Sequence, residues 1–256
     1  MKITKYLNFQ QEHKDLIIRV KDIIENELSL NSFKILYFVD PAQTLIVQDV
    51  CHHYENINCF FISKFSDPER RLCVLAQGTT TIETAAMTTL FSFHFRSKFN
   101  KLRHQDVLGA LLNLKIARKH LGDIYINADN AYFEVNKTIE DYVSASLERI
   151  NTVPVKLVKC CATIKNEKKF LAFDAVVNSL RLDNIIKAIT GLSSSKTRAL
   201  ILNSFVKVNY VTKTNHTLLL REGAVLSIRG YGRFQLESYH VTKKDKYRLK
   251  YVKFIG

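Results

Sequence analysis

The sequence predicts an α+β protein in three parts: a small N-terminal α/β domain, a middle domain of βαββαβ order, and a C-terminal domain of two helices and a small sheet. Helical and alternating apolar patterns succeed one another along the chain. Hydrophobic residues make up 46% and charged residues 24% of the 256 residues, which is ordinary for a folded protein. These patterns place the domains at residues 1–77, 82–160 and 178–256.

The N-terminal domain mixes the two periodicities. Apolar residues recur at helical spacing after Leu16, and Asp40-Pro41 is a strong helix start, because Asp can cap the helix and Pro suits its first turn. The small polar stretch 78–81 marks the expected boundary. The expected elements are a helix over 16–28, a strand over 33–38, a helix opening at Pro41, and strands over 58–62 and 71–75.

The middle domain reads β-α-β-β-α-β, the split βαβ arrangement of ferredoxin-like domains. Phe91, Phe93 and Phe95 share one side of a strand, and we expect them in the core rather than as a base-stacking platform. Residues 159–172 are basic and less regular, and are interpreted as a linker, with a partial strand as the open alternative. The expected elements are a strand over 90–95, a helix over 104–114, a hairpin of strands 123–126 and 131–135, a helix capped by Asn136, and a strand over 153–158.

The C-terminal domain begins with two short helices. Leu182, Ile185 and Ile186 form an apolar face, and Gly191 can end the first helix in the left-handed conformation. Ser193 or Ser194 can cap the second helix. A strand over 206–208 follows, with Lys207 on its polar side, and Glu222-Gly223 is expected to form a turn before a strand over 225–229.

The distribution of charge is the main functional signal. The chain carries a formal net charge of +14. From residue 180 onward it holds 15 Lys+Arg against 4 Asp+Glu, a net +11, which leaves +3 for the first 179 residues. A concentrated basic face attracts polyanions, so nucleic acid is the leading ligand class. An anionic membrane surface is the weaker alternative, and no run of about 18 apolar residues predicts membrane insertion.

Three segments of the C-terminal domain resemble the S-four RNA-binding domain. These are Arg181-Leu182-Asp183, Leu192 to Ala199, and Val206 to Asn209, which occur in the order and spacing of that module's motifs. Two positions depart from its pattern. Ser194 replaces a basic residue, which removes one expected phosphate contact, and Ala224 replaces the Asp of a Gly-Asp turn.

The resemblance extends over most of the chain to the YlmH family, bacterial S-four proteins encoded beside cell-division genes. Residues 227–234, Ser-Ile-Arg-Gly-Tyr-Gly-Arg-Phe, are similar to that family's S-R-G-x-G-R-F ending. Residues 67–71, 104–109 and 122–124 are similar to its A-E-R-K-R, H-R-D-x-L-G and G-D-I patterns. The resemblance implies a ribosome-associated protein that binds the large ribosomal subunit carrying peptidyl-tRNA, in rescue of stalled translation.

The candidate RNA contacts are basic, hydroxyl and aromatic side chains of the C-terminal domain. Lys and Arg contact phosphates, Arg can also reach base edges, and an aromatic ring can stack on an unpaired base. The bound RNA is expected to be ribosomal RNA, tRNA or both. The candidates are Arg181, Ser195, Lys196, Arg198, Lys207, Arg229, Tyr231 and Arg233. A basic loop of the middle domain offers a weaker second contact through Arg96, Lys98, Lys101 and Arg103.

Two other classes of function remain open. S-four domains are often attached to RNA-modifying enzymes, but the spacing from Asp183 to Thr190 is wrong for a pseudouridine synthase, and no methyltransferase turn is present. We therefore expect no enzymatic activity. A protein-interaction role linked to cell division is the third class. For Asp183 itself, a structural role at the helix N-terminus is favoured.

The remaining signals predict a cytoplasmic monomer without cofactors. Polar residues follow the first eight too closely for a signal peptide. The odd number of cysteines, without framework spacing, fits a reducing compartment. Cys51-His52-His53 with Cys59 lacks the paired spacing of a zinc site, so no metal is expected, and Cys160-Cys161 is expected to be a buried pair.

Overall fold

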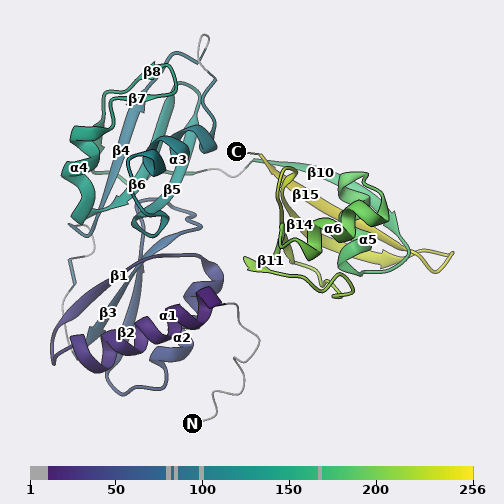
Figure 1. The fold of residues 1–256 in the computed structure, drawn as a ribbon, viewed down its shortest axis with the longest axis horizontal. Coiled ribbons are helices and arrows are strands. Elements are labelled where there is room, and N and C mark those ends of the chain that lie inside the picture. Colours follow the sequence, from purple (N-terminus) through teal and green to yellow (C-terminus); the bar gives the residue numbers. More distant parts are fainter. Residues whose placement is uncertain (1–10, 79–81, 84–85, 98–100, 167–168, 256) are drawn as a thin grey trace. The chain divides into compact units, whose positions relative to one another are not determined.

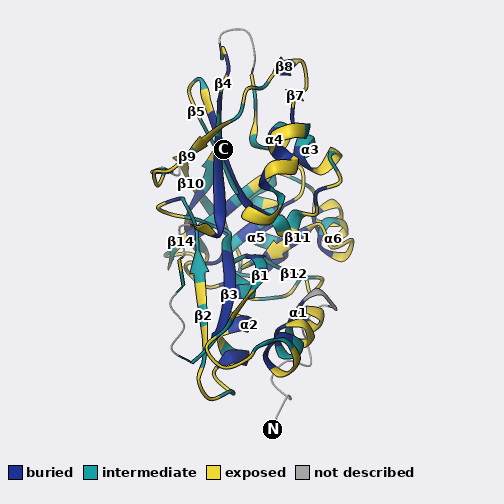
Figure 2. Cartoon of the chain, turned by 90° about the vertical axis from the view of Figure 1, so that its left-hand side faces the viewer, coloured by how far each residue is buried: buried dark blue, intermediate teal, exposed yellow. Residues whose placement is uncertain are grey.

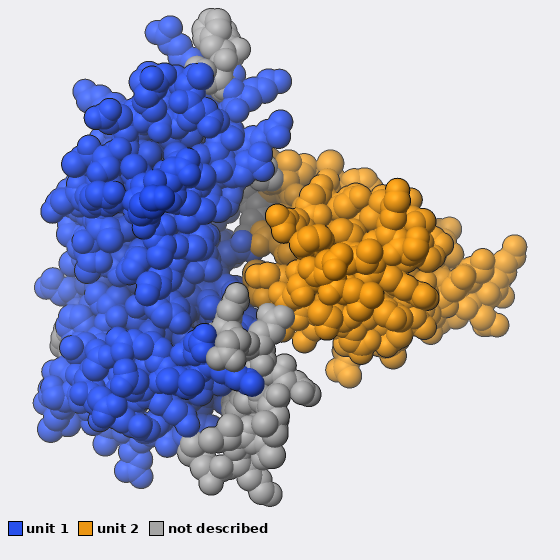
Figure 3. All heavy atoms as spheres, viewed as in Figure 1, with its two compact units in different colours: residues 1–167, 256 blue, residues 168–255 orange. Residues whose placement is uncertain are grey.

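The computed structural model describes residues 11–78, 82–83, 86–97, 101–166 and 169–255. It divides into two compact units, residues 1–167 with residue 256, and residues 168–255 (Figures 1 and 3). The first unit contains both of the first two predicted domains, and the division between them stays a prediction. Most of the predicted boundary, residues 79–81, lies outside the described residues. The mixed helix-and-sheet class predicted from the sequence is confirmed.

The N-terminal part of the first unit is a three-stranded antiparallel sheet of order β1-β3-β2. Its central strand β3 is buried along most of its length (Figure 2). The predicted cap of α2 is confirmed, because the Asp40 carboxylate accepts the Gln43 N–H at 2.9 Å and Pro41 is the first helical residue. The elements are α1 (Gln11–Asp22), a π-helical turn (Ile23–Glu27), β1 (Phe33–Val39), α2 (Pro41–Cys51), β2 (Ile57–Ile62) and β3 (Arg71–Gln77).

The second part of the first unit has a four-stranded antiparallel sheet of order β5-β6-β4-β9. This strand order, with one helix after β4 and one after β6, is that of a split βαβ arrangement. Phe91, Phe93 and Phe95 are buried, as predicted. The elements are β4 (Thr88–His94), α3 (His104–Asn113), β5 (Leu121–Asn127), β6 (Asn130–Asn136), α4 (Glu140–Ser146), β7 (Arg149–Ile150), β8 (Val153–Pro154) and β9 (Val158–Cys160), with 3₁₀ turns at Arg118–His120 and Lys137–Ile139.

The last strand of this sheet differs from the prediction. Val153–Pro154 turns back on Arg149–Ile150 through Asn151, whose φ is 52°. Pro154 has no N–H to donate, so a continuous strand over 153–158 would lose a sheet hydrogen bond there. The edge strand is β9 instead, which pairs with β4. Its end leaves Cys160 half-buried and Cys161 exposed, so the expectation of a buried cysteine pair is wrong.

The two sheets of the first unit meet at a polar junction. The Asp123 carboxylate accepts the Glu69 N–H at 2.5 Å and the Arg70 N–H at 3.1 Å. The Arg70 guanidinium donates to the Phe38 carbonyl at 2.6 Å and to the Leu121 carbonyl at 3.3 Å. Two of the segments that carry the family resemblance, residues 67–71 and 122–124, are therefore brought together to join the sheets.

Other polar groups complete this junction. Arg118 donates to the Leu121 and Gly122 carbonyls at 2.6 and 3.1 Å, and burial, with the nearby Arg70 charge, lowers its pKa to about 10. Glu134 accepts the Ser63 hydroxyl at 2.6 Å and the Lys64 N–H at 2.9 Å. Burial raises the pKa of Glu134 above its ordinary value.

The second unit is a six-stranded sheet of order β10-β15-β14-β13-β11-β12. Helices α5 and α6 pack on one face (Figure 1), over a core that includes Ile185, Ile186, Ile201, Leu236 and Leu249. The elements are β10 (Lys169–Val177), α5 (Leu182–Thr190), α6 (Ser194–Leu202), β11 (Val206–Val208), β12 (Val211–Thr212), β13 (Val225–Ile228), β14 (Gly232–Val241) and β15 (Tyr247–Ile255).

The helix boundaries of the second unit follow the predicted signals. Gly191 ends α5 with φ 70°, in the left-handed region that favours glycine. The Ser193 hydroxyl accepts the Lys196 N–H at the start of α6. The alternative that segment 159–172 is partly strand holds at its end, because Lys169–Val177 forms strand β10. This strand pairs over its whole length with β15, a partner that lies far away in the sequence.

No helix within the described parts of the chain combines the length and the apolar character needed to cross a membrane.

The junction in the first unit can be tested at Gly122. A Cβ added there would lie 2.7 Å from the buried Phe38 ring and 3.0 Å from the Glu134 Cβ. Gly122→Ala should therefore lower the free energy of unfolding by roughly 1–3 kcal/mol, the usual cost of overpacking. Gly109→Ala is the matched control, because no atom lies within 4 Å of the added Cβ in helix α3. Its helix should gain about 0.5–1 kcal/mol. Urea denaturation measures both, and equal effects would contradict the close packing at Gly122.

Candidate nucleic-acid interface

The candidate RNA-binding residues of the second unit fall on two different faces. Arg181, Ser195, Lys196 and Arg198 lie on α6 or at the start of α5, and are named here the helix-side cluster. Lys207 lies between the buried Val206 and Val208 on β11, so its side chain points to the sheet face away from the helices. Lys207 pairs with Ser227, and Ser227 with Arg233, which places Arg233 on that same face.

Asp183 organises the helix-side cluster. Its carboxylate accepts two hydrogen bonds from the Arg181 guanidinium, at 2.7 and 3.1 Å, and the Asn184 N–H at 2.9 Å. His216 Nδ1 lies 3.3 Å and Arg198 Nε 3.8 Å from the same carboxylate. Asp183 is only 8% exposed. The structure thus shows the contacts expected of a structural residue at this helix start.

The surrounding cations fix the charge state of Asp183. Burial acts to raise its pKa, but the hydrogen bonds and charge of Arg181, with the Asn184 amide and His216, lower the pKa below its ordinary value. Asp183 is therefore ionised at neutral pH, and it engages and orients Arg181. The Arg198 side chain is 54% exposed, and Lys196 is exposed. These two cations are the members of the cluster best placed to meet a phosphate.

Lys187 is a cation of this region that the sequence motifs do not reveal. Its ammonium donates to the Ser194 hydroxyl at 3.2 Å, at the position where the S-four pattern has a basic residue. A positive charge is thus supplied there from the last turn of α5. The signal available in the sequence is the placement of Lys187 on the polar side of a helix whose apolar face is formed by Ile185, Ile186 and Ile189.

The remaining C-terminal candidates contact neighbouring side chains of the second unit. Arg229 is exposed, and its guanidinium lies 4.9 Å from the centre of the Phe205 ring. Tyr231 is half-buried against the core beneath the helices. The Arg233 guanidinium lies 4.3 Å from the centre of the Phe254 ring, and burial lowers its pKa. Arg233 is therefore half-buried in contact with the Phe254 ring and does not stand out into solvent.

The basic loop of the first unit is only partly described. Arg96, Lys101 and Arg103 are exposed, and Lys98 lies outside the described residues. The Arg103 N–H donates to the Asp106 carboxylate at 2.8 Å, which starts helix α3. The three cations border the segment 98–100, so the placement of the loop as a second contact stays a prediction.

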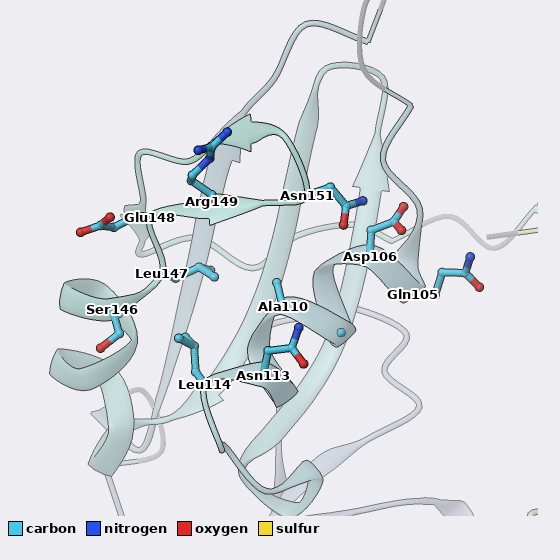
Figure 4. A pocket seen from close by; sticks show the side chains of 11 residues that line it. Gln105, Asp106, Ala110, Asn113, Leu114, Ser146, Leu147, Glu148, Arg149 and Asn151 are labelled. Atoms are coloured by element: carbon cyan, nitrogen blue, oxygen red, sulfur yellow. The ribbon is translucent and has the colours of Figure 1, made fainter.

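A shallow hollow of about 550 Å³ lies beside α3 and the β7–β8 hairpin. Its lining is largely polar, with Asp106, Asn113 and Asn151 around it (Figure 4). Gln105, Asp106 and Gly109, from a segment that carries the family resemblance, contribute to its wall. Across the described ranges, no group of three or more His, Cys, Asp or Glu side chains is arranged to hold a metal ion.

The chain is similar to known proteins in three kinds of comparison. Residues 84–164 match the family model described as "Putative RNA-binding domain in YlmH". The chain is 27% identical over 253 residues to the ribosome-associated protein quality control protein P2 of Bacillus subtilis (strain 168), covering 96% of this chain and 97% of that protein. It is also similar to the solved structure of the cell division protein ylmH from Streptococcus pneumoniae, with 22% identity and a TM-score of 0.49, covering 60% of this chain and 94% of the other.

The family-model match places a YlmH-type RNA-binding segment in the middle of this chain. The resemblance to the YlmH family that the sequence motifs predict is thereby confirmed. The family model covers the middle of the chain, where the sequence motifs suggested only the weaker, second RNA contact. Residues 104–109, whose pattern resembles that of the family, lie within the matched segment.

The role of Asp183 can be tested by its pH dependence. Its folded pKa lies below the unfolded value of about 3.9, so its stabilisation is present above that value and is lost as the pH falls through the folded pKa. Asp183→Asn should lower the free energy of unfolding at neutral pH by roughly 1.5–3 kcal/mol, the range for hydrogen bonds to a charged group.

The difference between wild type and Asp183→Asn should shrink as the pH is lowered below the unfolded pKa. Urea denaturation at neutral and acid pH measures it. Asp174→Asn, an exposed carboxylate in β10 of the same unit, is the control and should have little effect. A deficit in Asp183→Asn that is the same at both pH values would show that the ion pairs contribute nothing.

Proposed function

We propose that this protein is a non-catalytic, ribosome-associated factor that binds structured RNA through the helix-side cluster of its second unit. The observation that carries the proposal is the grouping of Arg181 and Arg198 around the buried Asp183, with the exposed Lys196 on the same helix as Arg198, on a unit whose sequence holds most of the net charge. A guanidinium held by a carboxylate, as Arg181 is held by Asp183, meets a folded phosphate backbone without first losing much conformational freedom. A-form RNA favours recognition of shape and backbone.

The middle segment adds a second contact to the proposal. It matches a model described as an RNA-binding domain, and its exposed Arg96, Lys101 and Arg103 supply cations. Two basic surfaces on one chain raise the overall affinity when both can engage one large RNA. A ribosomal RNA, or a tRNA held on a ribosome, offers such an extended target.

The finer proposal concerns the place of action. The Bacillus subtilis relative, which corresponds to this chain over nearly its full length, is named a ribosome-associated protein quality control protein. We infer that this chain acts on large ribosomal subunits carrying peptidyl-tRNA, in the rescue of stalled translation, as a cytoplasmic monomer. The Asp183 environment supports a binding role over a catalytic one, because that carboxylate is engaged by Arg181 and nearly buried.

Sedimentation of cell extract tests the proposal. Lys196→Glu/Arg198→Gln removes both exposed cations and avoids a new carboxylate beside Asp183. The wild type should travel with free large subunits, and the double variant should move largely to the top of the gradient. Added salt should weaken the wild-type association, because phosphate contacts release counterions, with about 0.9 in the salt slope for each contact to duplex.

Lys14→Glu/Lys34→Glu is the control, with two exposed lysines of the first unit. It should sediment as wild type. If wild type and both variants all remain at the top of the gradient, the ribosomal role is contradicted. If wild type and the helix-side variant travel together with large subunits, recruitment depends on another surface, and the helix-side cluster is not the binding site. Turnover of a modified nucleotide by the purified protein would contradict the non-catalytic role.

A further inference from the structure

The face of the second-unit sheet that points away from α5 and α6 carries a continuous cross-strand row. In antiparallel pairs, residues directly opposite one another have their side chains on the same face. Thr212 pairs with Lys207, Lys207 with Ser227, and Ser227 with Arg233. The row continues through the Arg233 guanidinium over the Phe254 ring, and Phe254 pairs with Phe170. It therefore crosses all six strands, roughly 24 Å at about 4.8 Å between strands.

Two aromatic rings form the platform at one end of this row. The Phe170 and Phe254 ring centres lie 5.0 Å apart in an edge-to-face arrangement. Phe170 is 47% exposed on the edge strand β10. The Arg233 guanidinium lies 4.3 Å from the Phe254 ring centre and contacts that ring as well. A phenylalanine nearly half exposed on a strand and supported in this way is positioned to stack on a flat partner.

The same face also carries several basic residues. Lys250 pairs with Ser238 and Asp174, and Arg248 pairs with His240 and Val176, so these side chains share the face with the row. Lys207, Arg248 and Lys250 are all exposed. Among the residues in paired register Asp174 is the single acidic one, and the exposed Glu237 lies at the bulge of β14. The β14–β15 turn, which projects from the unit (Figures 1 and 3), continues this charge with Lys243, Lys244 and Lys246 against Asp245.

We propose that this surface, named here the sheet face, binds a single-stranded segment of RNA, separately from the helix-side cluster. Phe170 and Phe254 stack on unpaired bases, while Lys207, Arg248 and Lys250 follow the phosphates. The inference rests on the proposed RNA-binding function and adds a second surface with a different class of RNA. It also gives a role to Lys207, whose position on β11 places it on the face away from the helices.

Charge and ring placement together favour unpaired RNA over other occupants. A duplex presents phosphates and grooves but keeps its base faces stacked, so it cannot use the exposed Phe170 ring. A protein strand added along the free edge of β10 would use backbone groups and would gain nothing from the lysines and arginine in the neighbouring β15. An aromatic platform beside a basic track is the combination that single-stranded nucleic acid requires.

The test measures the affinity of the full chain for two probes by fluorescence anisotropy: an oligouridylate of about ten nucleotides and an RNA hairpin of similar charge. Phe170→Thr removes the exposed ring and keeps a strand-forming residue. Arg248→Gln/Lys250→Gln removes two exposed cations on β15. None of these side chains belongs to the core under the helices, so both variants should fold as wild type, which circular dichroism checks.

Phe170→Thr should weaken oligouridylate binding about tenfold, within the range for one stacked base. Arg248→Gln/Lys250→Gln should weaken it further and reduce the salt slope by roughly 1.4, at about 0.7 for each contact to a single strand. Both variants should bind the hairpin within about twofold of wild type, because that probe uses the helix-side cluster. Lys196→Glu/Arg198→Gln should show the reverse pattern. Phe60→Thr, a partly exposed strand phenylalanine of the first unit, should change neither affinity.

The outcomes separate the two proposals. If wild type binds neither probe, the proposed function and this inference both fail. If wild type binds both probes, and the sheet-face variants bind oligouridylate as wild type does, the inference alone is overturned. Equal losses for both probes would make the surface a general anion-binding face and would also overturn it. So would a change in oligomeric state by light scattering without a change in oligouridylate affinity, because the face would then join two copies of the chain.

Discussion

The pairing of β15 with two partners is the constraint on which the second unit depends. Strand β15 lies between β10 and β14 and pairs with both along nearly its whole length. It thereby links β10, which precedes the helices, to β14, which follows them. One side of β15 contributes Leu249 and Tyr251 to the core, and the other side presents Arg248 and Lys250 to solvent. A single strand thus builds the core beneath α5 and α6 and also the basic face opposite them.

The first unit depends on a different kind of constraint, a polar junction that leaves few choices of geometry. Asp123 accepts two consecutive backbone N–H groups, and Arg70 donates to carbonyls of both sheets. Hydrogen bonds to charged groups in a partly buried setting are stronger than neutral ones and are directional. The close approach of Phe38 to Gly122 adds a steric requirement at the same place. The segments that resemble the YlmH family here thus hold the two sheets together.

Local sequence signals predicted the helix boundaries correctly. The strands that were not predicted correctly depend on pairing between distant segments. The Asp40 cap, the Gly191 helix end and the Ser193 cap all depend on residues within a few positions of one another, and all are confirmed. Strand β10 was predicted only as an alternative because its exposed Phe170, Leu171 and Phe173 do not alternate with polar residues, and its partner β15 begins 70 residues after its own end. Val153–Pro154 was misassigned because a two-residue hairpin leaves almost no pattern.

The candidate site shows the same division between local and long-range information. The types of residue that could meet RNA were readable from the motifs, but the face on which each stands was not. Successive side chains of a strand point to opposite faces of the sheet. Because Val206 and Val208 point into the core, Lys207 points to the face away from Lys196. Lys187 replaces a missing charge through a contact from one helix to the next.

Two surfaces of different chemistry on one small unit suit a target that has both paired and unpaired RNA. The helix-side cluster offers cations held by a buried carboxylate, which favours a phosphate backbone of fixed shape. The sheet face offers the exposed Phe170 ring beside the half-buried Phe254 ring and a longer basic track, which favours a strand whose bases are free. Because the helices and the sheet share one core, the spacing between these surfaces is fixed by packing. An RNA that presents a stem beside a loop at that spacing would engage both surfaces and gain from their effective concentration.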